Sequence, residues 1–212
     1  MRKKIFVALL VFSSLISYSQ DSIVEKRWLR IGFVYGFSAQ NRIIKQDSDY
    51  TYESNAFKLS SQFKLYNKNK HFFEILIEPS YYNSKHESLN PWHDFYTSSD
   101  NPDYYRDLYM RMKTINEYVL NLGIIYRYRL TNNISFYALG NVGPMYIDTD
   151  TEMLKKGFAF SDIFALGSNY KVGNYSFDLK MMARHVSNLD LQKPNYGLNS
   201  FGFEFGTYYE FN

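Results

Sequence analysis

Apolar and polar residues alternate along most of this chain, and that pattern limits what it can fold into. From Leu29 to Ser38 the large apolar residues occupy one parity and Arg, Gly, Val and Ser occupy the other. The same period returns in seven further segments, which are residues 57–65, 73–78, 118–129, 134–146, 158–171, 175–187 and 199–211. Successive side chains of a strand point to opposite faces, so each segment predicts a strand with two different faces. The fold class is therefore all-β.

The connections between these segments alternate in length. Those near 67–70, 131–133 and 172–175 are tight, whereas the long polar ones are residues 39–53, 82–115, 147–157 and 188–198. Eight strands can close into a filled barrel, which removes the sheet edges. Short turns on one side and long loops on the other are typical of outer-membrane barrels. We therefore predict an eight-stranded antiparallel up-and-down transmembrane β-barrel with long extracellular loops. A soluble barrel of lipocalin type, with its apolar face inward, is the alternative.

Aromatic and charged residues favour the membrane barrel over the soluble one. The chain has 18 Phe, 21 Tyr and 2 Trp among 212 residues, and many fall near strand ends, as in the aromatic girdles of membrane barrels. The expected turn-end girdle is Tyr126, Tyr128, Tyr170, Tyr175, Tyr208 and Tyr209, and the loop-end girdle is Tyr35, Phe37, Tyr81, Tyr118 and Tyr146. The polar faces predict ion pairs inside the barrel, from Arg30, Lys58, Lys64, Arg127, Arg129, Arg184, Glu74, Glu78, Asp178 and Glu204.

Residues 1–20 have the features of a secretory signal peptide. Three basic residues at positions 2–4 precede the apolar run 5–16, and small residues follow. Its removal leaves residues 21–212 as one barrel domain with 24 − 3 = 21 basic and 21 acidic residues, a balance that gives a nucleic-acid partner no electrostatic support. No other apolar run approaches the length of a membrane helix. The absence of cysteine excludes disulfides, Cys-ligated zinc and thiol nucleophiles.

Two polar residues end the apolar row of segment 175–187. His185 and Ser187 share the parity of Tyr175, Phe177, Leu179, Met181 and Ala183, so both are expected to face lipid. Placing polar groups there costs free energy unless they are used. Residues two apart on one strand have Cα atoms roughly 6.6 Å apart, so an imidazole can reach the hydroxyl. We interpret the pair as a general base and a nucleophile at the loop-end rim.

The segment from His185 to Phe203, HVSNLDLQKPNYGLNSFGF, resembles the lipid A 3-O-deacylase family of PagL type, whose relatives are often called acyloxyacyl hydrolases. The resemblance implies a serine-type carboxylic ester hydrolase of the Gram-negative outer membrane that removes an ester-linked acyl chain from lipid A or lipopolysaccharide. It implies that His185 is the base, that Ser187 is the nucleophile, and that Asn188 and Asn195 form the oxyanion hole. It implies no cofactor and no metal, and no protein partner is predicted beside the lipids of the outer membrane.

The acidic residue that orients the histidine in the family is replaced here by Asn199. An amide can orient an imidazole but cannot neutralise imidazolium, so reduced activity is one expectation. Strand pairing across a two-residue turn at 173–174 puts Asp162 beside His185 on the same face, where it could supply the missing carboxylate. A bulge that turns Asp162 away is the alternative.

The neutral Asn199 also keeps a second function open, a non-enzymatic outer-membrane barrel whose loops bind a partner or shield the surface. The other polar features point to no further site. His71, His86 and His93 lack metal-ligand spacing and are expected in turns and loops. The long loop 83–116 is rich in Tyr, Asp, Ser and His, a composition that could bind sugar or phosphate headgroups.

Overall fold

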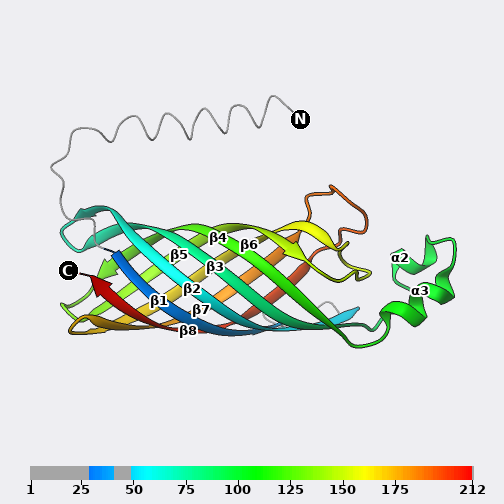
Figure 1. Ribbon diagram of the computed structural model, residues 1–212, viewed down its shortest axis with the longest axis horizontal. Coiled ribbons are helices and arrows are strands. Elements are labelled where there is room, and N and C mark those ends of the chain that lie inside the picture. The colour runs from blue at the N-terminus through cyan, green and yellow to red at the C-terminus, as the bar shows by residue number, and fades with distance from the viewer. Residues whose placement is uncertain (1–28, 41–48, 212) are drawn as a thin grey trace, which may run out of the picture.

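Eight antiparallel strands form a closed barrel in the computed structural model, which describes residues 29–40 and 49–211 (Figure 1). Each strand pairs with its neighbours in sequence, and β8 closes the ring on β1. The strands are β1 Leu29–Ala39, β2 Tyr50–Lys68, β3 His71–Ser88, β4 Lys113–Arg129, β5 Ile134–Ile147, β6 Gly157–Val172, β7 Tyr175–Ser187 and β8 Leu198–Phe211. The predicted up-and-down barrel is confirmed. The predicted signal peptide, residues 1–20, lies outside the described residues.

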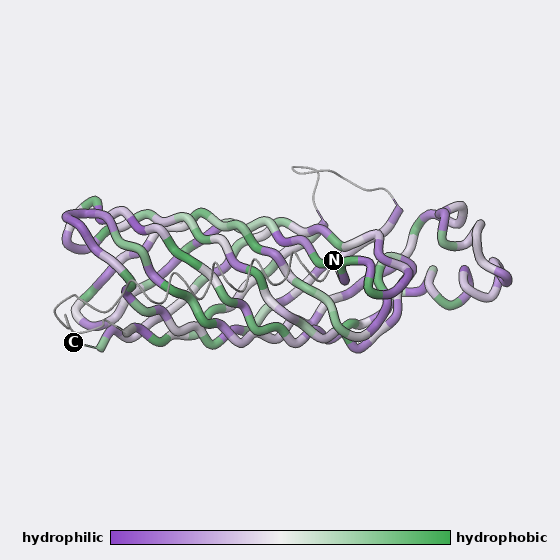
Figure 2. The backbone as a smooth tube through the Cα atoms, turned by 90° about the horizontal axis from the view of Figure 1, so that it is seen from above, coloured by the Kyte–Doolittle hydropathy of each residue, from purple (hydrophilic) through white to green (hydrophobic). Residues whose placement is uncertain are grey.

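The apolar faces of the strands point outward. Phe33 is 75% exposed, and Phe164 and Phe203 are 59% and 58% exposed, whereas the residues on either side of each are buried. Hydrophobic and hydrophilic residues accordingly alternate along the barrel wall (Figure 2). A soluble barrel would bury this apolar surface, so the lipocalin alternative is wrong and the outward faces have the character that a lipid environment requires.

Exposed tyrosines occupy both ends of the outer surface, as predicted for aromatic girdles. They include Tyr126, Tyr170, Tyr175 and Tyr209 at the turn end and Tyr35, Tyr118 and Tyr146 at the loop end. Tyr208 is an exception to the prediction. It is 2% exposed, and the guanidinium carbon of Arg30 lies 4.0 Å from its ring centroid inside the barrel. Strand alternation accounts for this, because Tyr208 has the opposite parity to Tyr209.

Ion pairs fill the barrel interior. Lys58 Nζ lies 3.1 Å from Glu78 Oε1 and 2.8 Å from Glu204 Oε1, and Arg30 Nη2 lies 2.7 Å from Asp178 Oδ2. These contacts confirm the predicted interior network. The sequence did not indicate two further participants, Glu117, which pairs with Arg184 at 2.6 Å, and Lys180, which pairs with Glu204 at 2.8 Å. Buried charges persist only when they are paired and hydrogen-bonded in this way.

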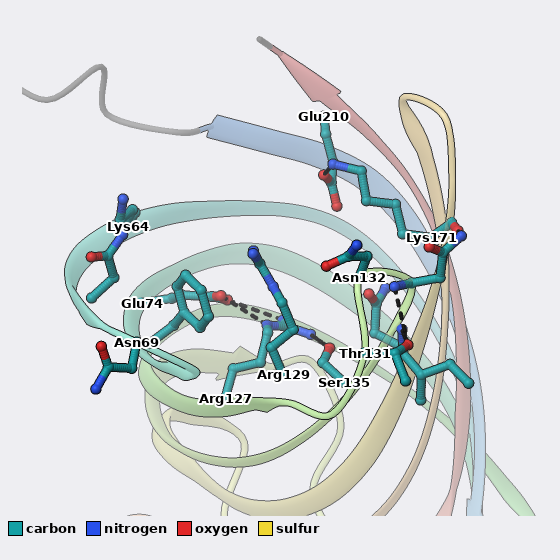
Figure 3. Close-up of a pocket in the computed structure, with 15 residues that line it drawn as sticks. Lys64, Asn69, Glu74, Arg127, Arg129, Thr131, Asn132, Ser135, Lys171 and Glu210 are labelled. Carbon is teal, nitrogen blue, oxygen red and sulfur yellow. Dashed lines mark hydrogen bonds and ion pairs between the residues drawn. The ribbon is translucent and has the colours of Figure 1, made fainter.

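A polar pocket of about 330 Å³ opens at the turn end of the barrel (Figure 3). Arg127 lies at its floor and points toward Glu74, with Nε 2.8 Å from Oε1. Two residues predicted for the interior lie nearer the surface, because the strands end there: Lys64 is half-buried, and Arg129 is exposed with its guanidinium carbon 4.5 Å from the Phe72 ring centroid. This end carries the short turns and lies opposite the long loops.

The strands extend further at the loop end than their hydrophobic pattern predicted. β2 begins at Tyr50, β3 continues to Ser88 and β4 begins at Lys113, so the predicted loops 39–53 and 82–115 are too long. The reason is that Tyr82, Ser84 and His86 face inward while their outward neighbours are also polar, so the contrast between faces disappears. Two helices follow β3, α2 Asp94–Thr97 and α3 Pro102–Tyr109. Within the described ranges, no helix is long and apolar enough to cross a membrane.

Candidate active site

Four polar side chains meet on the outer surface at the loop end of β6, β7 and β8. His185 pairs in register with Asp162 on one side and with Asn199 on the other, while Ser187 pairs with Phe160. The side chains of His185, Asp162 and Asn199 are exposed, and Ser187 is half-buried. The β6–β7 register is the predicted one and contains no bulge, so Asp162 stands outward beside His185. The structure therefore brings the expected residues together on one face.

A hydrogen bond fixes the ring of His185. Its Nδ1 lies 2.8 Å from Oδ1 of Asn199, across the β7–β8 pair. A carboxamide oxygen only accepts, so Nδ1 carries the proton and donates it to Asn199. In the neutral ring the lone pair then resides on Nε2, which is the tautomer a general base needs.

Ser187 lies on the same face of β7 as His185. In the part of the chain that the structure describes, its hydroxyl makes no hydrogen bond to the imidazole. The Cα atoms of two such residues are roughly 6.6 Å apart. Rotation about the side-chain torsions can bring the imidazole nitrogen and the hydroxyl oxygen to hydrogen-bonding distance. The arrangement therefore contains a base and a hydroxyl within reach of each other.

The chain turns sharply just after Ser187. Leu189 and Asp190 adopt φ angles of 54° and 59°, the left-handed region that non-glycine residues rarely occupy. The backbone N–H of Asn188 donates to Oδ1 of Asn195 at 2.9 Å, and the Asn188 amide donates to the Gln192 carbonyl at 2.9 Å. Strained backbone of this kind is concentrated at functional sites.

One carboxylate organises the rest of this turn. Asp190 Oδ1 accepts from Lys193 Nζ at 3.0 Å and from Asn195 Nδ2 at 3.2 Å. The hydrogen bonds from Lys193 and Asn195 hold the pKa of Asp190 below its ordinary value. Asn195 is half-buried and keeps a second amide N–H for another acceptor, whereas the predicted oxyanion residue Asn188 is only 1% exposed.

A glycine that the sequence analysis did not select touches the histidine ring. Gly197 has φ of +80°, and a Cβ at this position would lie 2.9 Å from Cε1 of His185. Only glycine combines this backbone conformation with such a close approach. Its position twelve residues after His185 gave no signal in one sequence, because the contact depends on how the loop returns to the barrel.

Neighbouring segments hold the loop against the barrel. The Tyr196 amide donates to the Met153 carbonyl at 2.8 Å, and Asn195 forms a bridge with Leu154. The backbone N–H of Asn199 donates to the Tyr50 hydroxyl at 3.3 Å. These contacts come from the β5–β6 loop and from β2, so the positions of Asn195 and Asn199 depend on residues far away in the sequence.

The other histidines have structural positions. His86 was predicted in a turn or loop, but it is fully buried in β3, with Nε2 3.0 Å from Oε2 of Glu152. The prediction was wrong because the β5–β6 loop folds into the barrel mouth and supplies the partner. His71 is also a strand residue, at the start of β3, and His93 precedes α2 in the loop. Residues 29–40 and 49–211 contain no cluster of three His, Cys, Asp or Glu residues suited to a metal ion.

The chain is similar to known outer-membrane proteins. The family model for lipid A 3-O-deacylase (PagL) matches residues 90–208. The crystal structure of the outer membrane enzyme PagL superimposes with a TM-score of 0.56 at 12% identity, covering 84% of this chain and 97% of that one. Neisserial surface protein A gives 0.47 at 9% identity, covering 88% of this chain and 98% of its own. OprG from Pseudomonas aeruginosa gives 0.45 at 11%, covering 88% and 96%. The chain matches none of the curated proteins.

Proposed function

Because the chain belongs to the lipid A 3-O-deacylase (PagL) family, we propose that it is an outer-membrane esterase that removes an ester-linked acyl chain from lipid A. Ser187 is the nucleophile and His185 the general base in this proposal. The observation that carries it is the 2.8 Å contact between His185 Nδ1 and Asn199 Oδ1 on the lipid-facing side of the barrel. In the neutral ring that contact leaves the lone pair on Nε2, and His185 and Ser187 lie on the same face of β7.

The reaction proceeds in two stages. Ser187 Oγ attacks the ester carbonyl while His185 Nε2 takes its proton, and the imidazolium then protonates the departing sugar oxygen. This leaves the acyl chain on Ser187. Water attacks the acyl-enzyme while His185 takes its proton, and the imidazolium then returns a proton to Ser187 Oγ as the acyl–oxygen bond breaks and the fatty acid leaves. The substrate ester reaches the rim laterally, within the outer leaflet, so the ion-paired barrel interior takes no part.

The carbonyl oxygen becomes negatively charged in both stages and needs hydrogen-bond donors. Asn195 is suited to this role, since it is half-buried and keeps a second amide N–H beyond the one used within the loop. Asn188 is 1% exposed, so we assign it the supporting role of holding Asn195 through the hydrogen bond from its backbone N–H. Removing one donor of this kind from a site that excludes water raises the activation barrier by about 2.7–4 kcal/mol. The left-handed backbone at Leu189 and Asp190 sets the course of the chain between Asn188 and Asn195.

The imidazolium formed in each stage needs a negative charge nearby. Asn199 orients the ring but is neutral, so we assign the charge to Asp162, which stands opposite His185 on β6. Facing residues of paired strands have Cβ atoms about 4.5–5.5 Å apart, a distance at which a carboxylate stabilises a cation without direct contact.

Mass spectrometry of lipid A from cells that express the wild type, Ser187→Ala or His185→Ala tests the proposal. The wild type is expected to remove one acyl mass, and both variants are expected to leave lipid A intact. Ser168→Ala is a matched control, because Ser168 lies on β6 and pairs with Leu179 of β7, away from the rim. Loss of the acyl mass in all samples, or in none, would contradict the proposal.

The neutral Asn199 favours one second candidate, a barrel of the same fold that binds lipid A without turning it over. It predicts unchanged lipid A in every sample together with retained lipid A binding by Ser187→Ala. The same spectra therefore separate an enzyme from a binding protein.

A further inference from the structure

A cavity of about 390 Å³ lies beside the candidate active site, between α2 and the loop that precedes β8. Both segments stand at the loop end of the barrel (Figure 1). Its walls are Phe95, Ser98 and Ser99 from the β3–β4 connection and residues 193–196 from the loop after Ser187. Binding pockets for small molecules occupy roughly 300–1,000 Å³, so the cavity has the size of a ligand site. We name it the headgroup cavity.

Its lining combines aromatic rings with hydrogen-bonding groups. Phe95 contributes a ring from α2, and Tyr196 contributes one from the opposite wall. The hydroxyls of Ser98 and Ser99 donate to the carbonyls of Asp94 at 2.6 Å and Tyr96 at 2.8 Å, which leaves their lone pairs to accept from a ligand. A sugar ring offers apolar C–H faces to aromatic rings and a rim of hydroxyl donors, so it complements this lining.

One cation stands at the cavity. The side chain of Lys193 is 78% exposed, and its Nζ lies 3.0 Å from Asp190 Oδ1. An ammonium group has three donors, of which this contact uses one. The other two can bind a phosphate at the cavity edge, where a point charge on a flexible stem is a common phosphate ligand.

The two walls are fixed to each other. The ring centroids of His93 and Tyr196 are 4.6 Å apart in an edge-to-face contact, and His93 Nδ1 accepts from the Phe95 amide at 3.2 Å. Tyr96 of α2 is fully buried and anchors the helix. A site whose walls are already in contact loses little conformational entropy when a ligand binds.

The headgroup cavity is linked by one hydrogen bond to the residue that follows the candidate nucleophile. Asn195 lines the cavity, and its Oδ1 accepts from the backbone N–H of Asn188, the residue after Ser187. The next residues lead to Gly197, which abuts the His185 ring. The cavity and the candidate nucleophile therefore share one loop, and a sugar bound in the cavity would lie at the same end of the barrel as Ser187.

We propose that the headgroup cavity binds a phosphorylated hexosamine unit of the lipid substrate, with the sugar between Phe95 and Tyr196 and the phosphate on Lys193. The choice of this ligand rests on the proposed function, because the lipid A headgroup is a phosphorylated glucosamine disaccharide. Headgroup binding would select the glycolipid over phospholipids that share its acyl chains.

Equilibrium binding in detergent micelles tests the assignment, with Ser187→Ala as the background so that no lipid is cleaved. The probes are lipid A, dephosphorylated lipid A and phosphatidylglycerol. Phe95→Ala is expected to weaken binding of both forms of lipid A about tenfold, and Lys193→Gln to weaken only the phosphorylated form by a similar factor, as expected for one lost interaction. Neither variant should change the affinity for phosphatidylglycerol.

Tyr104→Ala and Lys156→Gln are matched controls, because both side chains are exposed in neighbouring segments and neither lines the cavity. They should bind all three lipids as the background does. Lys193 is exposed, so its variant tests the proposal even if Phe95→Ala misfolds. Unchanged lipid A affinity in Lys193→Gln, or equal weakening for all three lipids, would overturn the assignment. Because binding is measured without turnover, selective weakening would uphold the cavity even if the wild type proves to be no hydrolase.

Discussion

Arg184 and His185 are adjacent in β7, and their surroundings are opposite. Arg184 points inward, is 2% exposed and pairs with Glu117 at 2.6 Å, with further hydrogen bonds to Ser161 and Tyr52. His185 points outward, is exposed and has one neutral partner, Asn199. The inner residue has its hydrogen-bonding capacity largely occupied, whereas the outer one keeps a free ring nitrogen. The comparison indicates that polar residues inside this barrel stabilise it and that those on the outer rim remain available for chemistry.

The same contrast separates the two groups of carboxylates. Glu204 inside the barrel lies 2.8 Å from both Lys58 and Lys180. Asp162 on the rim makes no hydrogen bond or ion pair within the described residues, although it faces a lipid environment. An unpaired polar group there costs free energy. Its position beside His185 is consistent with use in the reaction.

Truncation of the inner residue, Arg184, is expected to have the largest effect. Arg184→Ala should lower the free energy of unfolding by about 3–5 kcal/mol, because it leaves Glu117 buried and unpaired. His185→Ala should change it by less than about 0.5 kcal/mol, as is usual for exposed positions. Urea unfolding of the barrel in lipid vesicles measures both. The double variant Arg184→Met/Glu117→Met is the control and should recover much of the loss. Equal destabilisation by Arg184→Ala and His185→Ala would refute the distinction between the two faces.

Gly197 tests whether the geometry of the outer site matters. Gly197→Ala should lower kcat about 10–100-fold, because a Cβ 2.9 Å from Cε1 displaces the His185 ring. Gly173→Ala is the matched control, since Gly173 also has a positive φ, of 61°, but a Cβ there would meet nothing within 4 Å. It should cost about 1–2 kcal/mol of folding free energy for the left-handed backbone and leave kcat unchanged. Steady-state deacylation assays measure kcat for both variants. Equal loss of activity in Gly197→Ala and Gly173→Ala would contradict the prediction.

The two neighbours of His185 sharpen the account of its charge. Asp162→Asn should lower kcat about tenfold, and Asn199→Asp should raise it by a similar factor, because a carboxylate beside the ring stabilises imidazolium. Kinetics with purified protein in micelles measure both changes. Full activity in Asp162→Asn would exclude that residue, and no gain in Asn199→Asp would mean that orientation alone limits the rate.

The smallest effect is expected at Asp190. Asp190→Asn should lower kcat about two- to threefold at neutral pH, since it weakens the attraction to Lys193 that helps to order the loop. The pKa of Asp190 is lowered in the fold, so its contribution is complete above the ordinary value of 3.8 and is lost as the pH falls through the lower, folded-state value. The free energies of unfolding of the wild type and Asp190→Asn, compared at pH 7 and below pH 3.8, check this sign, because they should differ at pH 7 and converge at the lower pH. Asp103→Asn, which breaks an exposed pair with Arg106 on α3, should have no effect.

The faces of the strands and the register of β6 with β7 were predictable, whereas contacts between loops were not. A period of two residues assigns each side chain to a face, and the tight turn at Gly173 and Asn174 sets the pairing of Asp162 with His185. The partnership of Arg184 with Glu117 spans 67 residues and depends on barrel curvature. The burial of His86 against Glu152 depends on how a loop folds into the barrel mouth. Periodicity contains no information about either.

The central claim is that Ser187 is a nucleophile activated by His185 on the lipid-facing rim. A long-chain alkyl fluorophosphonate, dissolved in the lipid of reconstituted vesicles, tests this most directly, with intact-mass and peptide mass spectrometry as the readout. The account predicts one phosphonyl adduct on Ser187, at least about 10³-fold slower labelling in His185→Ala, and none in Ser187→Ala. Equal labelling rates in the wild type and both variants, or a wild-type protein that stays unlabelled, would contradict it.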